Sequence, residues 1–283
     1  MIEQGILYIV ATPIGNLGDM TPRAVETLQQ VSLIAAEDTR HSSKLLHYFG
    51  INTRCQAYHE HNERELAPRL VERMKQGESI ALVSDAGTPL VSDPGYHLVR
   101  EARLVGVDVV PVPGASAMIA ALSASGLPSD RFSFEGFLPA KSAGRRQRLQ
   151  EVVNDPRTLI FYESTHRIES SLADMADVFG EQRYAVVARE LTKRFETIHG
   201  DTFANLIPWM ANDADQRRGE FVVMVHGADE AKDEGVDPEA ERILKVLLAD
   251  LPVKQAAALA AKITGLKKNA LYKFALSLGD CRT

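Results

Sequence analysis

The sequence predicts an α/β protein with two α/β domains and a small helical domain at its C-terminal end. The 283 residues are too many for one small domain and suit two α/β domains with an appendage. Short apolar runs alternate with helical patterns up to residue 226, and the charge pattern then changes abruptly. We therefore expect domains at residues 1–113 and 114–228, an acidic linker at 229–237 and a helical domain at 238–283.

The first predicted domain alternates strands with helices. Thr21 and Pro22 suit the start of a helix, with Thr as the N-cap and Pro in the first turn. Asn62 with Glu65 has the spacing of a capping box, which predicts another helix start. Helices are also expected at residues 41–49 and between the later strands. The order predicts a mostly parallel sheet, with strands at residues 7–11, 33–36, 79–84 and 107–112.

The second predicted domain repeats the alternation with different content. It begins after Gly114 with a helix of small residues at 115–125. Two domains of this kind commonly hold a ligand in the cleft between them. The expected strands are residues 132–135, 158–163, 184–190 and 221–226, and the expected helices are 142–153, 166–179 and 203–211.

Composition argues against several classes of protein. Apolar residues make up 45% of the chain and charged residues 25%, as in ordinary globular proteins. No apolar run approaches the ~20 residues that span a bilayer, and the first residues lack the pattern of a signal peptide. The two cysteines, Cys55 and Cys281, provide neither a disulfide framework nor a Cys-based metal site. We expect a cytoplasmic protein without membrane contact.

The C-terminal segment is predicted to bind nucleic acid, although the net charge of the chain is −6. Residues 229–241 hold seven acids and one lysine, whereas residues 252–278 hold five lysines and no acid. This asymmetry indicates an acidic linker followed by a basic binding module. After a helix at 238–249, helices at 253–263 and 267–276 form a helix-turn-helix pattern around a glycine. The lysines expected to contact RNA phosphates are Lys254, Lys262, Lys267 and Lys268.

A second basic cluster follows Pro139 and includes Lys141, Arg145, Arg146 and Arg148. Their spacing places several charges on one side of a helix entry, which suits phosphates and not the reading of bases. A solvated helix face explains the cluster equally well.

Four loops at predicted strand ends carry the candidate chemistry, because ligands gather at the carboxyl ends of parallel strands. The loop at 11–19 matches neither the dinucleotide fingerprint nor the P-loop. The loop at 84–95 holds two glycines, two prolines and two aspartates, which turn chemistry explains poorly; its Asp93 suits a helix cap. Ser116 either leaves backbone N–H groups free for a ligand or caps its own helix. Tyr162 is either core or the lining of a purine pocket.

Several of these segments resemble the tetrapyrrole methylase superfamily. They are Gly-Thr-Pro-Leu-Val at 87–91, Pro-Gly-Ala-Ser-Ala at 113–117 and Gly-Glu-Phe-Val-Val at 219–223. Within that superfamily, the strings at 10–19, 36–40 and 84–89 are similar to those of ribosomal RNA methyltransferases. The resemblance covers residues 6 to 226, and the basic tail is similar to the helix-turn-helix extension of that group.

The resemblance implies a fold of the tetrapyrrole methylase type with S-adenosylmethionine in the cleft between the domains. It implies methyl transfer to the ribose 2′-hydroxyl of a cytidine in small-subunit ribosomal RNA, either naked or in the assembled subunit, and a homodimer. The usual Gly-Asp-Pro is Gly-Thr-Pro at 87–89, so one acidic contact is missing, and whether Asp85 compensates is left open. Carried over by position, cofactor contacts fall at Pro13, Thr88, Leu90, Val91, Ser116, Ala117, Tyr162 and Leu191.

A ribose hydroxyl needs accurate positioning and help with its departing proton. Glu37, Asp38 and Arg40 follow the second predicted strand and are candidates to orient the ribose, although they could equally form a structural ion-pair network. Lys193 could stabilise charge on the ribose oxygen, or it could be a solvated surface lysine. Further candidates to assist removal of the hydroxyl proton are His59, His61 and Glu190.

The two histidines at 59 and 61 also invite a metal interpretation. They are only two residues apart, no second ligand cluster is evident, and methyl transfer needs no metal. We expect no metal site and a polar loop that faces RNA.

Two other functions remain open from the sequence. One is methylation of a tetrapyrrole or a modified protein side chain on the same scaffold, and the other is RNA binding without catalysis. The lysine-rich tail favours RNA as the substrate, because a small substrate would not need it.

Overall fold

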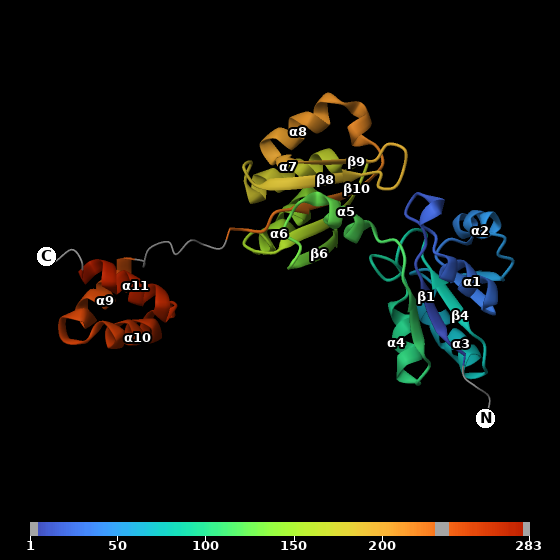
Figure 1. Cartoon of the computed structure of the whole chain (residues 1–283), viewed down its shortest axis with the longest axis horizontal. Coiled ribbons are helices and arrows are strands. Elements are labelled where there is room, and N and C mark those ends of the chain that lie inside the picture. Colours follow the sequence, from blue (N-terminus) through green and yellow to red (C-terminus); the bar gives the residue numbers. More distant parts are fainter. Residues whose placement is uncertain (1–4, 230–237, 280–283) are drawn as a thin grey trace. The chain divides into compact units, whose positions relative to one another are not determined.

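The computed structural model describes residues 5–229 and 238–279. The chain divides into two compact units, Met1–Gly227 and Ala228–Thr283 (Figure 1). The first unit contains two five-stranded sheets and the second contains helices. Apart from Asp229, the predicted acidic linker at 229–237 lies outside the described residues.

The first sheet is parallel throughout, as the alternation of strands and helices predicts. Its strand order is β3-β2-β4-β1-β5, and every pairing is parallel. The sequence did not predict β3, because this three-residue strand includes a polar glutamine and has no apolar run. The strands are β1 (Leu7–Val10), β2 (Leu33–Ala36), β3 (Cys55–Ala57), β4 (Ile80–Val83) and β5 (Val109–Val112).

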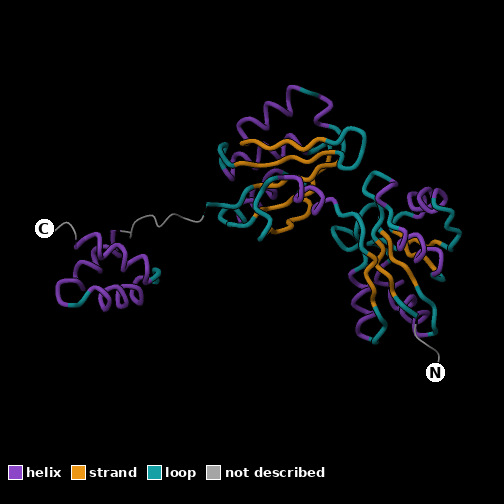
Figure 2. Tube along the Cα trace, viewed as in Figure 1, coloured by secondary structure: helices purple, strands orange, loops and turns teal. Residues whose placement is uncertain are grey.

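Helices cover both faces of this sheet (Figure 2). On one face, Leu28 and Leu46 of the first two helices pack on the strands. On the other, Met74 and Leu98 of the next two helices do so. Burial on both faces explains why the strands read as continuous apolar runs. The helices are α1 (Pro22–Gln30), α2 (Thr39–Tyr48), α3 (Glu63–Lys75) and α4 (Tyr96–Leu104).

One predicted helix cap is confirmed and two are wrong. Thr21 caps α1 by accepting a hydrogen bond from the Ala24 N–H. The Asn62 side chain does not cap α3, because it accepts from the His59 N–H and donates to the Ala57 carbonyl, which ties down the preceding loop. Asp93 does not cap α4, because the N-cap of that helix is Gly95, two residues later, with φ of 135°.

The second sheet is mixed. Its order is β6-β7-β10-β8-β9; β6 pairs with β7 in parallel, and the other pairings are antiparallel. The sequence did not predict β9, which is half-buried along its whole length and shows no alternation. The strands are β6 (Phe132–Phe137), β7 (Thr158–Ser164), β8 (Tyr184–Arg189), β9 (Thr197–Thr202) and β10 (Glu220–Val225).

The faces of the second sheet have different coverings. Helices α6 (Ser142–Glu151), α7 (Ile168–Phe179) and α8 (Phe203–Asn212) pack on one face. Helix α5 (Ala117–Ser125) packs on the other, together with Ile14 from the loop after β1. The first half of the unit therefore contributes to the core of the second half.

A buried ion pair joins α6 to α7. The Arg145 side chain is only 3% exposed, and its Nε donates to Asp174 Oδ2 at 2.6 Å. The Ser142 hydroxyl donates to the other oxygen of Asp174. This arrangement corrects the prediction that Arg145 contacts RNA, because its guanidinium lies in the protein interior.

The described residues of the second unit form three helices around a small core of their own. Leu244, Ala257 and Leu271 from the three helices are buried together. Gly265, with φ of 75°, ends the middle helix in the left-handed conformation that glycine favours. The predicted helix-turn-helix arrangement is confirmed in α9 (Pro238–Asp250), α10 (Val253–Thr264) and α11 (Lys268–Gly279).

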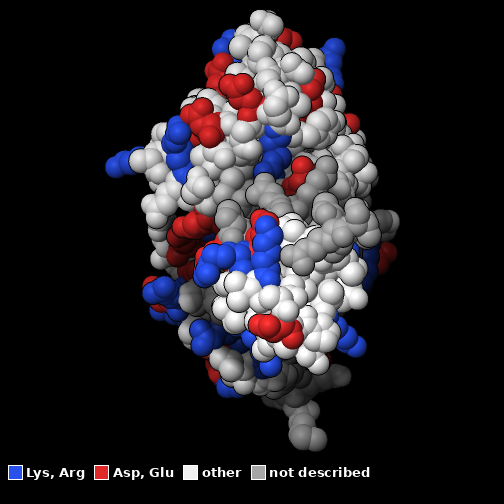
Figure 3. Space-filling model, turned by 90° about the vertical axis from the view of Figure 1, so that its left-hand side faces the viewer, with Lys and Arg blue, Asp and Glu red and all other residues white. Residues whose placement is uncertain are grey.

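None of the helices in the described residues combines the length and the apolar character needed to cross a bilayer. Figure 3 shows basic and acidic side chains interspersed on the visible face.

Replacing the buried arginine tests its structural role. Arg145→Met leaves the Asp174 carboxylate buried without its main partner, so we expect the free energy of unfolding to fall by about 3 kcal/mol. Arg146→Met is the matched control, since Arg146 is half exposed and its loss should cost less than about 1 kcal/mol. Urea unfolding measures both, and equal losses would contradict the assignment.

Candidate functional site

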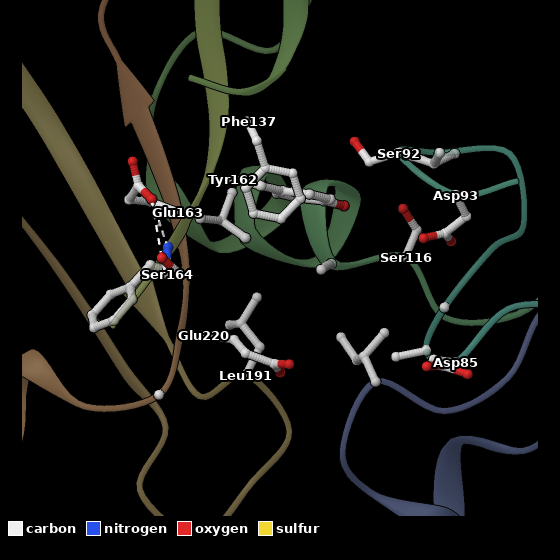
Figure 4. A pocket seen from close by; sticks show the side chains of 18 of the residues that line it. Asp85, Ser92, Asp93, Ser116, Phe137, Tyr162, Glu163, Ser164, Leu191 and Glu220 are labelled. Atoms are coloured by element: carbon white, nitrogen blue, oxygen red, sulfur yellow. Dashed lines mark hydrogen bonds between the residues drawn. The ribbon is translucent and has the colours of Figure 1, made fainter. Parts of the chain in front are cut away.

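A cavity of about 690 Å³ lies within the first unit, lined by loops from both sheets (Figure 4). Its walls come from the loops after β1, β2 and β4, the start of α5, the ends of β6 and β7, and the segments around Leu191 and β10. The lining residues are Ile14, Glu37, Asp85, Ala86, Gly87, Thr88, Val91, Ser92, Asp93, Ser116, Ala117, Phe137, Tyr162, Glu163, Ser164, Thr165, His166, Leu191, Gly219, Glu220, Phe221 and Val222.

The loop after β4 forms one wall because its backbone is held in an unusual shape. Leu90 and Ser92 have φ of 72° and 67°, which side chains other than glycine rarely adopt. Gly87 pairs with Thr12 through two backbone hydrogen bonds of 2.9 and 3.1 Å. The Thr88 hydroxyl donates to the Ala115 carbonyl at 3.0 Å, which ties this loop to the start of α5.

The start of α5 faces the cavity with its cap position unused. Ser116 stands at the N-cap, yet its side chain accepts no hydrogen bond from the helix. The Tyr162 hydroxyl accepts from the Met118 N–H at 3.2 Å, and burial raises the pKa of that tyrosine. Ser116 therefore presents its hydroxyl to the cavity at the N-terminus of a helix, and anionic groups such as carboxylates bind well at such positions.

Three carboxylates gather on the wall formed by the first sheet. Asp85 Oδ1 accepts from the Asp38 N–H at 3.1 Å, and the Asp85 N–H points at Glu37 Oε2 at 3.5 Å. Burial and the nearby Asp85 charge raise the pKa of Glu37. Burial, with Glu37 and Asp85 nearby, raises the pKa of Asp93 to about 6 despite a hydrogen bond from Ser84.

The cavity as a whole is acidic. Its lining includes five carboxylates and neither Lys nor Arg. Glu163 is neutralised by Arg167, whose Nε lies 3.0 Å away, and the cluster of Glu37, Asp85 and Asp93 has no comparable cation among the lining residues. A cavity of this character favours cationic ligands and disfavours phosphate.

The structure brings six of the eight predicted cofactor contacts into the cavity lining. Pro13 and Leu90 do not line it. Pro13 is buried next to Ile14, and Leu90 packs on the core of the first sheet. The six that line the cavity are Thr88, Val91, Ser116, Ala117, Tyr162 and Leu191.

The four predicted catalytic residues are not brought together. Glu37 lines the cavity, whereas Asp38 and Arg40 form an exposed ion pair with each other, and the Arg40 side chain is 90% exposed. Hydrogen bonds from Arg40 lower the pKa of Asp38. In the structure, Asp38 and Arg40 thus form an ion pair, which was the alternative to their orienting the ribose.

Lys193 is a partly exposed lysine that is paired with two carboxylates. Its Nζ donates to Glu190 at 3.0 Å and to Glu220 at 2.7 Å. Burial alone would lower the pKa of Lys193, but these hydrogen bonds outweigh burial and raise it. The lysine offsets the charge of Glu220 at the cavity edge and does not itself line the cavity, so its role at the reacting oxygen stays a prediction.

The predicted RNA-contacting residues differ in their surroundings. Arg146 pairs with Asp177 at 2.5 Å, and Arg148 pairs with Glu135 and Glu151. Lys141 is exposed at the start of α6. In the helical unit Lys254, Lys262, Lys267 and Lys268 are all exposed.

Sequence reasoning missed several lining residues. Asp93 was interpreted as a helix cap, and Phe137 was not singled out, because a phenylalanine at a strand end gives no signal of exposure. His59 and His61 are close to each other, with ring centroids 5.9 Å apart, but neither lines the cavity. No group of three or more His, Cys, Asp or Glu side chains suited to a metal ion occurs among the described residues.

Comparisons with known proteins match nearly the whole chain. The family model for tetrapyrrole (corrin/porphyrin) methylases matches residues 6–207, and the model for the RsmI C-terminal HTH domain matches residues 234–279. The ribosomal RNA small subunit methyltransferase I of Pseudomonas aeruginosa is 61% identical, with 97% of this chain and 98% of the relative covered. The protein of that name from Escherichia coli O157:H7 is 60% identical, with 97% and 96% covered.

Two solved structures share the fold at low identity. Diphthine synthase has a TM-score of 0.58 at 17% identity, with 78% of this chain and 90% of that chain covered. Uroporphyrin-III C-methyltransferase from Thermus thermophilus, complexed with S-adenyl homocysteine, has a TM-score of 0.52 at 17% identity, with 78% and 97% covered.

Removing the Glu37 charge should lower the pKa of Asp93. Glu37→Gln takes away one of the negative charges that raise it, but burial is the larger cause, so the shift should stay below about one pH unit. A carboxyl-carbon NMR titration of Asp93 measures it, with Glu72→Gln on the exposed side of α3 as the control. An Asp93 pKa that stays constant or rises in Glu37→Gln would mean that the two carboxylates do not interact.

Proposed function

Because the chain belongs to the ribosomal RNA small subunit methyltransferase I family of tetrapyrrole methylases, we propose that it methylates small-subunit ribosomal RNA with S-adenosylmethionine. The observation that carries the proposal is the similarity to relatives of that name along 97% of the chain, including the helical unit. The reaction we propose, following the sequence resemblance, is transfer to the ribose 2′-hydroxyl of a cytidine.

The cavity suits S-adenosylmethionine in size and in chemistry. Its volume of about 690 Å³ falls in the range of small-molecule sites. Thr88, Val91, Ala117, Tyr162 and Leu191 would hold the cofactor, with apolar and aromatic surface for the adenosine. The unused cap at Ser116 suits the cofactor's carboxylate, and the acidic wall suits its ammonium and sulfonium groups. When bound, the cofactor supplies an electrophilic methyl group.

Glu37 is the residue that we assign to the proton of the ribose hydroxyl. It lines the cavity, whereas Asp38 and Arg40 pair with each other outside it. A base is most effective when its pKa lies near the working pH, and the raised pKa of Glu37 moves it in that direction. Positioning of the hydroxyl in line with the methyl group supplies much of the remaining acceleration.

The helical unit is assigned to RNA phosphate. Its exposed lysines, Lys254, Lys262, Lys267 and Lys268, supply the positive charge that the acidic cavity lacks. The two units therefore have different roles. The cavity binds the nucleoside and the cofactor, and the helical unit contributes sequence-independent affinity for RNA. We further propose a homodimer and a cytoplasmic location, on the strength of the resemblance and of the composition.

Methyl transfer tests the proposal directly. With labelled S-adenosylmethionine, we expect label at a ribose of small-subunit ribosomal RNA, offered as assembled subunits and as naked RNA. A precorrin-type tetrapyrrole, offered in parallel, should stay unlabelled. Glu37→Gln should reduce turnover about 10²- to 10⁴-fold, a larger factor than the loss of cofactor affinity measured by calorimetry. Label in the tetrapyrrole alone would refute RNA as the substrate, and full turnover by the variant would refute the role of Glu37.

Neutralising the tail lysines should weaken RNA binding selectively. Changing Lys254, Lys262, Lys267 and Lys268 together to glutamine removes up to four phosphate contacts. The slope of log affinity against log salt should then fall by up to about 3, with cofactor affinity unchanged. Lys44→Gln, an exposed lysine of α2, is the control. An unchanged salt slope would mean that these lysines do not contact RNA.

A further inference from the structure

Phe137 is an aromatic side chain that lines the cavity and yet remains 54% exposed. The aromatic neighbour on the same wall, Tyr162, is half-buried and hydrogen-bonded. An exposed phenyl ring gains little from folding, because the hydrophobic contribution of a side chain depends on the area removed from water. Such a ring at the rim of a site is available to a ligand.

An irregularity in β6 determines where this ring lies. The register between β6 and β7 shifts between Phe134 and Gly136, and Gly136 has φ of 67°. Bulges of this kind change the direction of a side chain and are common next to active sites. A Cβ on Gly136 would lie 3.7 Å from the Ser92 hydroxyl, so the end of β6 approaches the loop after β4. The bulge thus places Phe137 at the edge shared by the two walls.

Tyr162 supports the ring without covering it. The ring centroids of Phe137 and Tyr162 are 5.6 Å apart, with an interplanar angle of 66°. Tyr162 is itself fixed by Phe134, at 4.8 Å, and by the Met118 N–H. Edge-to-face packing leaves a face of Phe137 open. Figure 4 shows Phe137 and Tyr162 together on one wall, with Ser92, Asp93 and Ser116 on the other side of the cavity.

The charge of the cavity limits which part of a nucleotide can enter. The lining residues include five carboxylates and no Lys or Arg, so phosphate groups are repelled. A nucleotide can therefore enter with its sugar and base while its phosphates stay outside. A base that leaves its stack loses stacking energy, and enzymes that act on such nucleotides replace it with aromatic contacts.

We propose that Phe137 is the surface on which the target nucleobase of the RNA stacks when its ribose enters the cavity. The inference rests on the proposed function, and it adds a substrate-positioning residue that faces the base and not the cofactor. The more buried Tyr162 and Leu191 remain for the adenosine of the cofactor, and Phe137, at the rim, meets a group that arrives from solvent.

The test compares two substitutions of Phe137 with a matched control. Phe137→Ala removes the stacking surface, Phe137→Trp keeps it, and Phe132→Ala removes the phenylalanine at the opposite end of the same strand, which does not line the cavity. For each variant we would measure the KM for assembled small subunits and for naked RNA, the Kd for S-adenosylmethionine by calorimetry, and the thermal midpoint.

We expect Phe137→Ala to raise the KM for RNA, or to lower kcat/KM, roughly 5- to 150-fold, the range expected for loss of one base–aromatic stack. In Phe137→Ala the Kd for S-adenosylmethionine should change less than about twofold. In Phe137→Trp the KM and kcat/KM for RNA should stay close to those of the unchanged protein. Phe132→Ala should leave both unchanged. A comparable rise in the cofactor Kd of Phe137→Ala, or no change in either constant, would overturn the inference.

The proposed function and this inference fail in different ways. If the unchanged protein binds S-adenosylmethionine but labels no RNA, the proposed function fails. If it labels RNA and Phe137→Ala does so with unchanged constants, only the inference fails. The thermal midpoint shows whether a loss of activity in Phe137→Ala reflects unfolding. If Phe137→Ala is unfolded, Phe137→Trp tests the inference instead, since it keeps an aromatic ring at this position.

Discussion

The cavity depends on a close approach between the loop after β1 and the second sheet. Ile14 of that loop is only 9% exposed and packs with Leu122 and Leu191 in the core of the second half. Gly15 follows, and a Cβ there would lie 2.5 Å from Lys193 Cγ, so any other residue would force the Lys193 side chain to move. The Asn16 N–H donates to the Thr192 hydroxyl at 3.0 Å. These contacts hold the loops that end the strands of one sheet against α5 and β8 of the other.

Electrostatics then determines what the cavity can do. Carboxylates from the first sheet face the space between the sheets, and burial raises the pKa of Glu37 and of Asp93. The basic residues near this space are already paired, Lys193 with Glu190 and Glu220 and Arg167 with Glu163. The exposed lysines that we propose for RNA phosphate belong to the helical unit and not to this cavity. This separation suits a reaction between a cationic cofactor and a hydroxyl that must lose a proton.

Much of the fold could be predicted from the sequence, because buried parallel strands leave a simple signal. Leu33–Ala36 was predicted with its observed bounds, since it is buried on both faces. The strand Thr197–Thr202 could not be predicted, because its residues are half-buried and alternate neither in polarity nor in size. The caps at Asn62 and Asp93 were mispredicted because the Asn62 side chain binds the preceding loop and because α4 begins only after Gly95.

Prediction of the candidate site from the sequence was limited for a similar reason. Loop sequences located most of the cavity, because unusual residues gather at the ends of the strands, such as Gly87, whose φ of 84° favours glycine. They did not show that Arg145 is buried while its basic neighbours are exposed, since the burial of Arg145 depends on its ion pair with Asp174, 29 residues away along the chain. They did not reveal Phe137 either, because its direction depends on the bulge at Gly136 and on contacts with the other sheet.

The most direct test of the central claim is to titrate S-adenosylmethionine calorimetrically into the protein and into Ala117→Trp. Ala117 lines the cavity at the first residue of α5, whereas Ala124 is an exposed alanine of the same helix, so Ala124→Trp is the control. The account predicts binding to the unchanged protein and to Ala124→Trp, and loss of binding in Ala117→Trp because indole fills the cavity. Equal binding by all three would place the cofactor elsewhere and contradict the account.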